Sequence, residues 1–382
     1  MLCTLPGARM IWIFWLAAAL VAYTYVGYVA WLRLRLLWRS RPALRGAVIP
    51  NVSVVMVVRN EEKILGSKLQ NLLSLDHPRD QLQIVVVSDG STDRTQQILH
   101  DYARDPRVHV VLNQLPKGKA SGLNDALEVA HGEIVVFTDA RQKIDVSAVR
   151  FLAENFADPE VGCVSGELML GDPATGETGQ GFGLYWRIEK QIRELESASG
   201  SVVGATGALY AARRELLTHV PAGTILDDVY LPMHIVRQGK RVVFDHRAIA
   251  WDSPDLGAER EFSRKVRTLS GNYQLVQLAP WLLGSENPIR FEFVSHKVLR
   301  LVVPVALAVL LIVSPLLKAP FYRAIFFAQL IFYALSMISL ARLTKGGSLA
   351  RVADAAGTFV LLNGAAMVAL ANFVSGKRAA WR

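Results

Sequence analysis

Apolar residues gather in one long run near the start of the chain and in three runs near its end. The first run, Met10–Leu32, has no charged residue. A helix of about 20 residues crosses the roughly 30 Å core of a bilayer. The later runs are Leu301–Leu317, Ala324–Ala341 and Ala355–Gly376. This pattern predicts four membrane-spanning helices. A cleaved signal peptide is the alternative for the first run, although the apolar core of such peptides is shorter, about 7–15 residues.

Between the first and second runs, short β-rich segments alternate with helical ones. Near-continuous apolar strands are typical of a parallel sheet that is covered on both faces. The predicted strands are Val52–Val58, Gln83–Val87, Val108–Leu112 and Ile134–Thr138, and the predicted helices are Glu61–Ser74, Thr92–Ala103 and Lys119–Ala130. This order predicts a doubly wound α/β domain.

The two patterns divide the chain into three parts. Residues 1–50 hold the first membrane helix and a basic linker, residues 51–280 form the α/β domain, and residues 281–382 hold the last three membrane helices. The segment Pro280–Phe293 mixes aromatic and charged residues. That mixture is typical of an interfacial helix. A buried helix of the α/β domain is an equal alternative for it.

The charge of the chain supports a membrane location. The 382 residues carry a net charge of +9, but residues 1–60 hold seven arginines and no acid, and the middle of the chain is acidic. A nucleic-acid partner is not expected, because it would require the positive charge on the soluble body. The arginines after the first run place the α/β domain on the cytosolic side of the plasma membrane. Two cysteines are too few for a disulfide scaffold.

Candidate chemistry begins at the ends of two predicted strands. Asp89 closes the second strand, and Asp139 directly follows the fourth. Ligands bind at the carboxyl ends of parallel strands, so these carboxylates predict a nucleotide or metal site. The motifs GxGxxG after the first strand and GxxxxGK[ST] are absent from the sequence. Their absence argues against a dinucleotide dehydrogenase and a P-loop NTPase.

Three further segments carry charge. Lys119 opens a predicted helix, where it could hold a diphosphate. Asp227 and Asp228 lie in an apolar stretch, which favours a proton acceptor or a helix cap. Arg264 and Arg267 belong to a cluster of cations just before the membrane region. Such a cluster can bind phosphates or anionic lipid headgroups.

Six motifs occur in one order over residues 52–272: VVRNEE, SDGSTDRT, KGKASGLNDAL, FTDA, ILDD and RKVRTLSGN. The ordered set resembles the membrane-integrated branch of the inverting family 2 glycosyltransferases, which includes chitin, hyaluronan, cellulose and poly-N-acetylglucosamine synthases. The resemblance implies a GT-A-type domain, a UDP-linked nucleotide-sugar donor, a glycan or lipid acceptor, and Mg²⁺ or Mn²⁺. Export of a polymer would also call for a homodimer or a partner subunit, since four spans are few for a pore.

The resemblance also implies residue roles. Asp228 would be the catalytic base, which takes the proton of the acceptor hydroxyl during a single in-line displacement. Asp139, as the first acid of the Asp-x-Asp motif, would hold the metal on the diphosphate. The residues implied for nucleotide binding are Asn60, Glu61, Asp89, Lys119 and Asp139, and those implied for the diphosphate or the acceptor are Arg141, Asp227, Arg264 and Arg267.

Two positions depart from the family pattern. Arg141 replaces the second acid of the Asp-x-Asp motif. The Gln-x-x-Arg-Trp signature of processive synthases keeps its arginine as Arg267 but ends in Thr268. Tyr273 is the nearby aromatic that would substitute for the missing tryptophan. Transfer of one sugar to a polyprenyl phosphate or another lipid is therefore an alternative to polymer synthesis. A catalytically degenerate membrane assembly protein is a second alternative.

Overall fold

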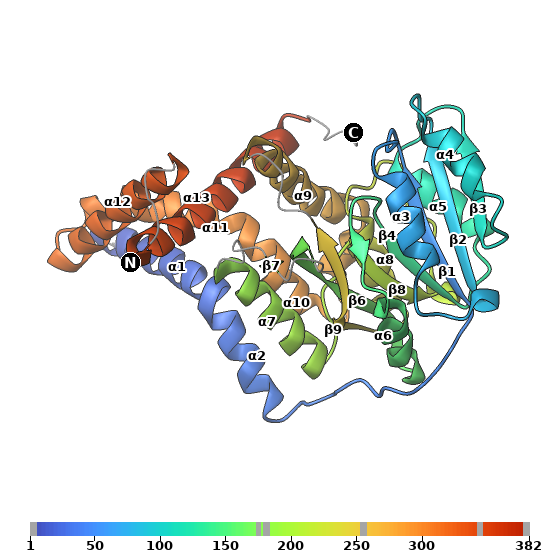
Figure 1. The fold of residues 1–382 in the computed structure, drawn as a ribbon. Coiled ribbons are helices and arrows are strands. Elements are labelled where there is room, and N and C mark those ends of the chain that lie inside the picture. The colour runs from blue at the N-terminus through green and yellow to red at the C-terminus, as the bar shows by residue number, and fades with distance from the viewer. Residues whose placement is uncertain (1–5, 173–176, 179–183, 253–257, 342–346, 377–382) are drawn as a thin grey trace.

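The computed structural model describes residues 6–172, 177–178, 184–252, 258–341 and 347–376. An α/β domain forms one end of the molecule, and a group of long helices forms the other (Figure 1). Within the described residues a nine-stranded sheet runs in the order β3-β2-β1-β4-β8-β6-β9-β5, with β7 paired to β6.

The first half of the sheet is parallel, as predicted. It contains β1 (Val52–Val58), β2 (Leu82–Asp89), β3 (Val108–Asn113) and β4 (Ile134–Thr138). Every residue of β1, β2 and β4 is buried. Such strands are apolar on both sides because helices cover both faces of the sheet.

The second half of the sheet is mixed. Strand β8 (Leu209–Arg213) runs antiparallel to both β4 and β6 (Val161–Asp172), and β6 pairs in parallel with β9 (Arg241–Asp252). The short strands are β5 (Lys143–Ile144) and β7 (Glu177–Thr178). The predicted doubly wound domain therefore has a mixed sheet, because β8 reverses the strand direction after β4.

Helices cover the two faces of the sheet with separate cores. On one face, Val55 and Val57 pack with α5 (Lys119–Val129) and α8 (Asp227–Arg237). On the other face, Val54 and Met56 pack with α3 (Leu65–Leu73) and α6 (Ala148–Glu154). Full burial of each such side chain contributes roughly 1.5–3 kcal/mol.

Helices α3 and α4 (Thr95–Tyr102) begin a few residues later than predicted. The residues before each helix bind the neighbouring loop instead. The backbone N–H of Glu61 donates to Thr95 Oγ1, and the backbone N–H of Arg94 donates to Glu62 Oε2. These contacts join the loops that follow β1 and β2.

Four helices are long and apolar enough to cross a membrane, among the described residues. They are Ala8–Leu36, Arg290–Leu316, Pro320–Leu340 and Ala350–Val374. The first consists of α1 (Pro6–Ala22), a π-helical turn and α2 (Tyr28–Leu36), and the second of α10 (Arg290–Phe293), a π-helical turn and α11 (Leu299–Val313). The third is α12 (Pro320–Leu340), and the fourth lies within α13 (Gly347–Val374). Figure 1 shows these helices as one group.

The segment Pro280–Phe293 is not a single interfacial helix. It contains a short 3-10 turn, Pro280–Leu283, and then the start of the second span. Leu282 and Phe293 are buried against the α/β domain. Leu283 and Phe291 of the same segment are exposed, so the segment is partly buried and partly open.

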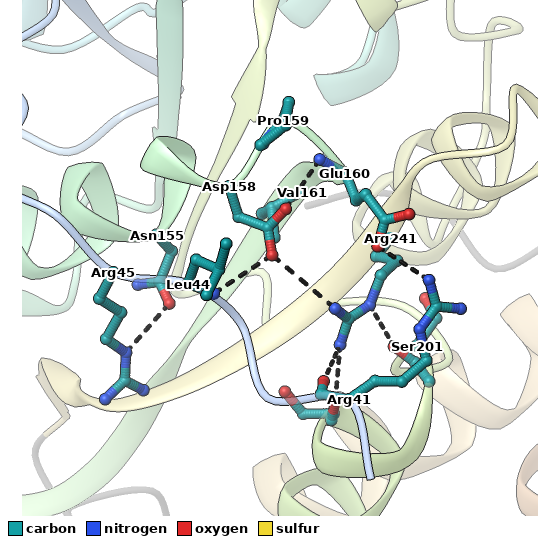
Figure 2. Close-up of polar contacts among 12 residues, drawn as sticks. Arg41, Leu44, Arg45, Asn155, Asp158, Pro159, Glu160, Val161, Ser201 and Arg241 are labelled. Atoms are coloured by element: carbon teal, nitrogen blue, oxygen red, sulfur yellow. Dashed lines mark hydrogen bonds and ion pairs between the residues drawn. The ribbon is translucent and has the colours of Figure 1, made fainter. Parts of the chain in front are cut away.

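The basic linker lies along the α/β domain (Figure 2). Arg241 donates to the carbonyl of Arg41, and Asp158 accepts from the backbone N–H of Leu44 at 3.2 Å. Arg45 donates to Asn155 Oδ1 at 3.3 Å. These contacts fix the path between the first membrane helix and β1. The linker arginines therefore bind the protein itself.

Two helices connect the α/β domain to the membrane helices. Helix α7 (Leu184–Ser199) packs against α2, where Ile192 meets Tyr28 and Leu32. Helix α9 (Ala258–Leu278) packs against α13, where the rings of Tyr273 and Phe373 stack with centroids 5.2 Å apart. The long apolar helices and the α/β domain are therefore packed against each other.

Candidate active site

The loops after β1 and β2 are tied together at the carboxyl edge of the sheet. Asn60, which follows β1, has a left-handed backbone (φ 55°), a conformation that Asn tolerates better than most residues. Its backbone N–H donates to Ser91 Oγ at 3.2 Å, and its side-chain oxygen accepts from the N–H of Thr92 at 2.8 Å. Asn60 therefore shapes this edge of the sheet.

Asp89 at the end of β2 is fully buried. Its two carboxylate oxygens accept backbone N–H groups of Lys117 at 2.7 Å and Gly118 at 2.9 Å. Gly118 has a positive φ of 92°, which suits glycine. Asp89 thus holds the loop that leads into α5. That loop places Lys119 at the start of the helix.

Lys119 joins two of the predicted acids. Its ammonium lies 2.9 Å from Asp139 Oδ1 and 3.4 Å from Asp227 Oδ1. Burial lowers the pKa of Lys119, but Asp139 and Asp227 outweigh it and hold the pKa above its ordinary value. The site therefore keeps a permanent cation between the ends of β4 and α8.

Asp228 lies half-buried in the first turn of α8. Its Oδ2 accepts the backbone N–H of Gly207 at 3.0 Å. A Cβ at position 207 would also lie 3.0 Å from that oxygen, so only glycine allows this approach without a shift of its neighbours. The hydrogen bond orients the carboxylate and leaves its second oxygen outside this contact.

Burial raises the pKa of Asp228 to about 6, and the adjacent Asp227 adds to the rise. Lys119 and Lys297 oppose it. Burial also raises the pKa of Asp227, with Lys119 in opposition. A carboxylate with a pKa near the working pH is suited to accept a proton in a reaction.

Arg141 pairs with Asp252, a buried acid at the end of β9. Arg264 of α9 lies 3.7 Å from the same carboxylate. Arg141 also lowers the pKa of Glu61, although burial and Asp93 raise it overall. The structure thus gathers Glu61, Arg141 and Arg264 beside Asp139. Asp252 was not predicted, since a lone acid after a strand resembles a turn residue.

Arg267 lies about one helical turn after Arg264 on α9, and its side chain is half-buried. It makes no hydrogen bond or ion pair with the part of the chain that the structure describes. Among the predicted site residues, ion pairs join Lys119 to Asp139 and Asp227, and Arg141 and Arg264 share Asp252. Asn60 and Asp89 instead hold the neighbouring loops.

Lys68 is a site-proximal residue that the sequence reasoning missed. Its ammonium is buried and donates to Thr138 Oγ1 at 2.9 Å and to the carbonyl of Gln142 at 2.6 Å. These two partners bracket Asp139. Burial lowers the pKa of Lys68 to about 7, against the pull of Asp139. The sequence did contain a signal, because Lys68 shares the apolar helical face of Leu65 and Leu72.

A metal ion would have a limited set of protein ligands here. No three His, Cys, Asp or Glu side chains gather into a metal site among the described residues. Asp139 is 41% exposed, and Lys119 contacts only one of its oxygens. Mg²⁺ is commonly held by one or two carboxylates together with substrate phosphates and waters. Asp139 therefore fits a cation that binds together with a diphosphate.

Comparison with known proteins shows which sequences and folds resemble this chain. Residues 53–220 match the model of the glycosyl transferase family 2. A poly-β-1,6-N-acetyl-D-glucosamine synthase of Staphylococcus epidermidis is 23% identical over 244 residues, which cover 61% of this chain and 57% of that protein. A β-monoglucosyldiacylglycerol synthase of Synechocystis is 28% identical over 192 residues, or 49% of this chain and 40% of that protein. The chain thus spans about half the length of these relatives.

A solved structure shares the fold over nearly the whole chain. It is a mannosyltransferase from Pyrobaculum calidifontis in complex with GDP-mannose and Mn²⁺, with a TM-score of 0.74 and 23% identity. The match covers 96% of this chain and 99% of that one. Residues 53–220 are thus similar in sequence to the glycosyl transferase family 2 model, and the fold is of the GT-A type.

Proposed function

We propose that the chain is a membrane-anchored, inverting glycosyltransferase with a UDP-linked sugar donor. The observation that carries this proposal is the placement of Asp228. Its carboxylate is oriented by the N–H of Gly207, and its pKa of about 6 suits a general base. It lies next to Asp227, which Lys119 connects to Asp139 at the donor edge of the sheet.

In the proposed reaction, Asp228 accepts the proton of the acceptor hydroxyl while that oxygen attacks the anomeric carbon. The bond between the anomeric carbon and the diphosphate oxygen breaks on the opposite face, so the configuration inverts. Lys119 and Arg141 are the cations that stabilise the negative charge on the leaving nucleoside diphosphate. Asn60, Glu61 and Asp89 form the nucleotide-side wall.

A bound Mg²⁺ or Mn²⁺ would supply further charge neutralisation on the diphosphate. Asp139 would be its protein ligand, since Arg141 occupies the position of the second acid in the Asp-x-Asp motif. The Mn²⁺ of the Pyrobaculum enzyme complex supports the use of a divalent metal.

The four apolar helices support a multi-pass protein of the plasma membrane. The arginines after the first helix favour a cytosolic position for the α/β domain. The two named relatives support a glycan or a lipid as acceptor. Arg264 and Arg267 would face the diphosphate or the acceptor. Polymer export would call for a homodimer or a partner subunit.

A second candidate is transfer of one sugar to a lipid. Thr268 stands where processive synthases carry an acceptor-stacking tryptophan. The ring of Tyr273, the predicted substitute, stacks on Phe373 of α13. This contact of Tyr273 with an apolar helix supports a short or lipid acceptor. Identification of the product as a polymer or as a lipid with one added sugar would separate the two candidates.

The test is release of nucleoside diphosphate by the full chain in native membranes. A panel of nucleotide sugars is supplied with Mg²⁺ or Mn²⁺, and Asp228→Asn is compared with Asp76→Asn, an acid exposed far from the site. We expect release from one donor, a loss of about 10²–10⁴-fold in Asp228→Asn, and normal release in Asp76→Asn. Undiminished release by Asp228→Asn would refute the assignment of the base. No release from any donor would favour the degenerate assembly protein.

A further inference from the structure

A cavity of about 300 Å³ lies between α7 and the strands β6 and β9. Its wall combines apolar side chains, among them Trp186 and Phe244, with the cations Arg187, Lys190 and Arg193 of α7. Helix α7 is also the helix that packs against the first membrane span (Figure 1). The cavity is therefore amphipathic and close to the membrane helices.

The cavity wall carries more cationic than acidic side chains: Arg187, Lys190 and Arg193 against Glu167 and Glu189. Lys190 is neutralised by Glu167 at 2.8 Å. Arg193 has only a long contact of 3.7 Å with Glu189. Arg187 is exposed, and it forms no ion pair with the residues that the structure describes. The wall thus keeps an excess of positive charge.

The cavity wall also contains an acid, Glu189, which already has partners among the residues of the second apolar helix. Glu189 accepts from Arg300 at 2.6 Å and lies 2.9 Å from a ring nitrogen of His296. Although burial raises the pKa of Glu189, Arg300 and His296 hold that pKa well below its ordinary value. Arg300 and His296 thus satisfy Glu189 at shorter distances than Arg193 does, and Arg193 remains a cation of the cavity wall.

Lys297 extends the cationic surface toward the catalytic base. It follows His296 on the second span, and no ion pair joins it to any described part of the chain. Its charge acts both on Glu189 of the cavity wall and on Asp228. Lys297 therefore adds positive charge beside the junction of Glu189 with His296, next to the cavity wall that carries Glu189.

We propose that this cavity binds the phosphate of a lipid acceptor, with Arg187, Arg193 and Lys297 as the phosphate-binding cations. The apolar wall would receive the first carbons of the lipid chains. A hydroxyl of the same headgroup would reach Asp228, lose its proton to that carboxylate and form the new bond to the sugar. The inference rests on the proposed function and names its acceptor class, an anionic phospholipid or phosphate-linked lipid that carries a free hydroxyl.

Three probes separate the phosphate from the lipid. Short-chain phosphatidylglycerol carries a phosphate, a hydroxyl and acyl chains, the matching diacylglycerol lacks the phosphate, and inorganic phosphate lacks the lipid. Binding to the full chain in detergent is measured by calorimetry. We expect phosphatidylglycerol to bind at least about tenfold more tightly than either of the other probes, the size of a lost charge-assisted hydrogen bond.

Substitutions of single basic residues test which of them bind the lipid phosphate. Arg193→Gln and Lys297→Gln are each expected to weaken phosphatidylglycerol about tenfold or more and to leave diacylglycerol unchanged. Lys297→Arg keeps the charge and should retain binding. Lys318→Gln, which removes an exposed cation between the second and third spans, is the matched control and should bind normally.

Equal binding of phosphatidylglycerol and diacylglycerol would overturn the proposal, as would an equal loss in Lys318→Gln. Inorganic phosphate that binds as tightly as phosphatidylglycerol would overturn the lipid as the source of the phosphate. The assay involves no turnover, so it succeeds or fails independently of sugar transfer. Loss of nucleoside diphosphate release in Asp228→Asn tests the proposed function separately.

Discussion

Two clusters of buried charge differ in how their acids are satisfied. At the candidate active site, Asp227 and Asp228 share the cation Lys119, and burial raises the pKa of both acids. At the junction between α7 and the membrane spans, Glu189 and Glu196 lie on either side of His296, each 2.9 Å from one of its ring nitrogens.

The junction supplies more partners than the active site. Glu196 also accepts from the hydroxyl of Tyr28 at 2.7 Å. Arg35 of the first span pairs with Glu292 of the second and donates to Ser199 of α7. These buried contacts therefore join α7 to the first and second apolar helices.

The difference separates a catalytic arrangement from a structural one. An acid that must exchange a proton needs incomplete compensation, so that its two protonation states are close in free energy. An acid that only holds helices together is best fully paired, because an unpaired buried charge is strongly destabilising. The predictions below test this contrast.

The largest expected effect is on stability at the junction. Glu196→Gln removes a buried carboxylate that faces His296, Tyr28 and a backbone N–H. We expect the free energy of unfolding to fall by about 3–5 kcal/mol, which a thermal melt in detergent would detect. Glu194→Gln, an exposed acid on the same helix, should melt like the unaltered protein. If Glu196→Gln unfolds at the same temperature as the unaltered protein, the junction does not stabilise the fold as proposed.

The next effect is on catalysis. Lys119→Gln removes the cation between Asp139 and Asp227. We expect kcat/KM to fall about 10²–10³-fold, as for loss of one preorganised donor to a developing negative charge. Because Lys119 lowers the pKa of Asp228, the acid limb of the pH profile should also move to higher pH. A profile that stays in place would show that Lys119 does not act on the base.

A smaller effect concerns pH in the unaltered protein. The carboxylate of Asp228 is the active form of a base, so activity should be present above its pKa of about 6 and be lost as pH falls through that value. We expect kcat/KM to fall about tenfold per pH unit below the pKa. Initial rates between pH 5 and 8 measure this fall in kcat/KM at low pH. The residual rate of Asp228→Asn should not show the same fall.

The smallest effect concerns Lys68. Lys68→Met leaves the carbonyl of Gln142 without this donor and loosens the loop that carries Asp139. We expect a loss of about 1–3 kcal/mol in stability and a higher KM for the donor at an almost unchanged kcat. Lys63→Met, an exposed lysine just before α3, is the control. An unchanged KM would limit Lys68 to a structural role.

Much of the fold follows from local pattern. Val52–Val58 and Ile134–Thr138 are strands with the predicted bounds, because runs of apolar, mostly β-branched residues have few other ways to be buried. The four spans were also predicted, although the second starts at Arg290 instead of Leu301. Its charged first turns are compatible with a helix because the α/β domain and α7 cover them.

Only part of the candidate site could be predicted from the sequence. Motif order pointed to Asp139, Lys119 and Asp228, and the structure places them around one edge of the sheet. Asp252 and Lys68 were not predicted. Asp252 lies 111 residues from its partner Arg141 in the chain, and Lys68 lies 70 residues from Thr138. Spacing along a chain carries information about neighbours in one helix or strand, not about such pairs.

The sequence by itself determined the four parallel strands, the four long apolar helices and the identities of the acids at the strand ends. Tertiary structure alone decided which cation each acid meets. Lys119 reaches Asp139 and Asp227 because Asp89 fixes the loop before α5, and Glu189 meets His296 because the second span packs beside α7. The strength of a charge pair depends on separation and burial, and both are set only when distant segments pack together.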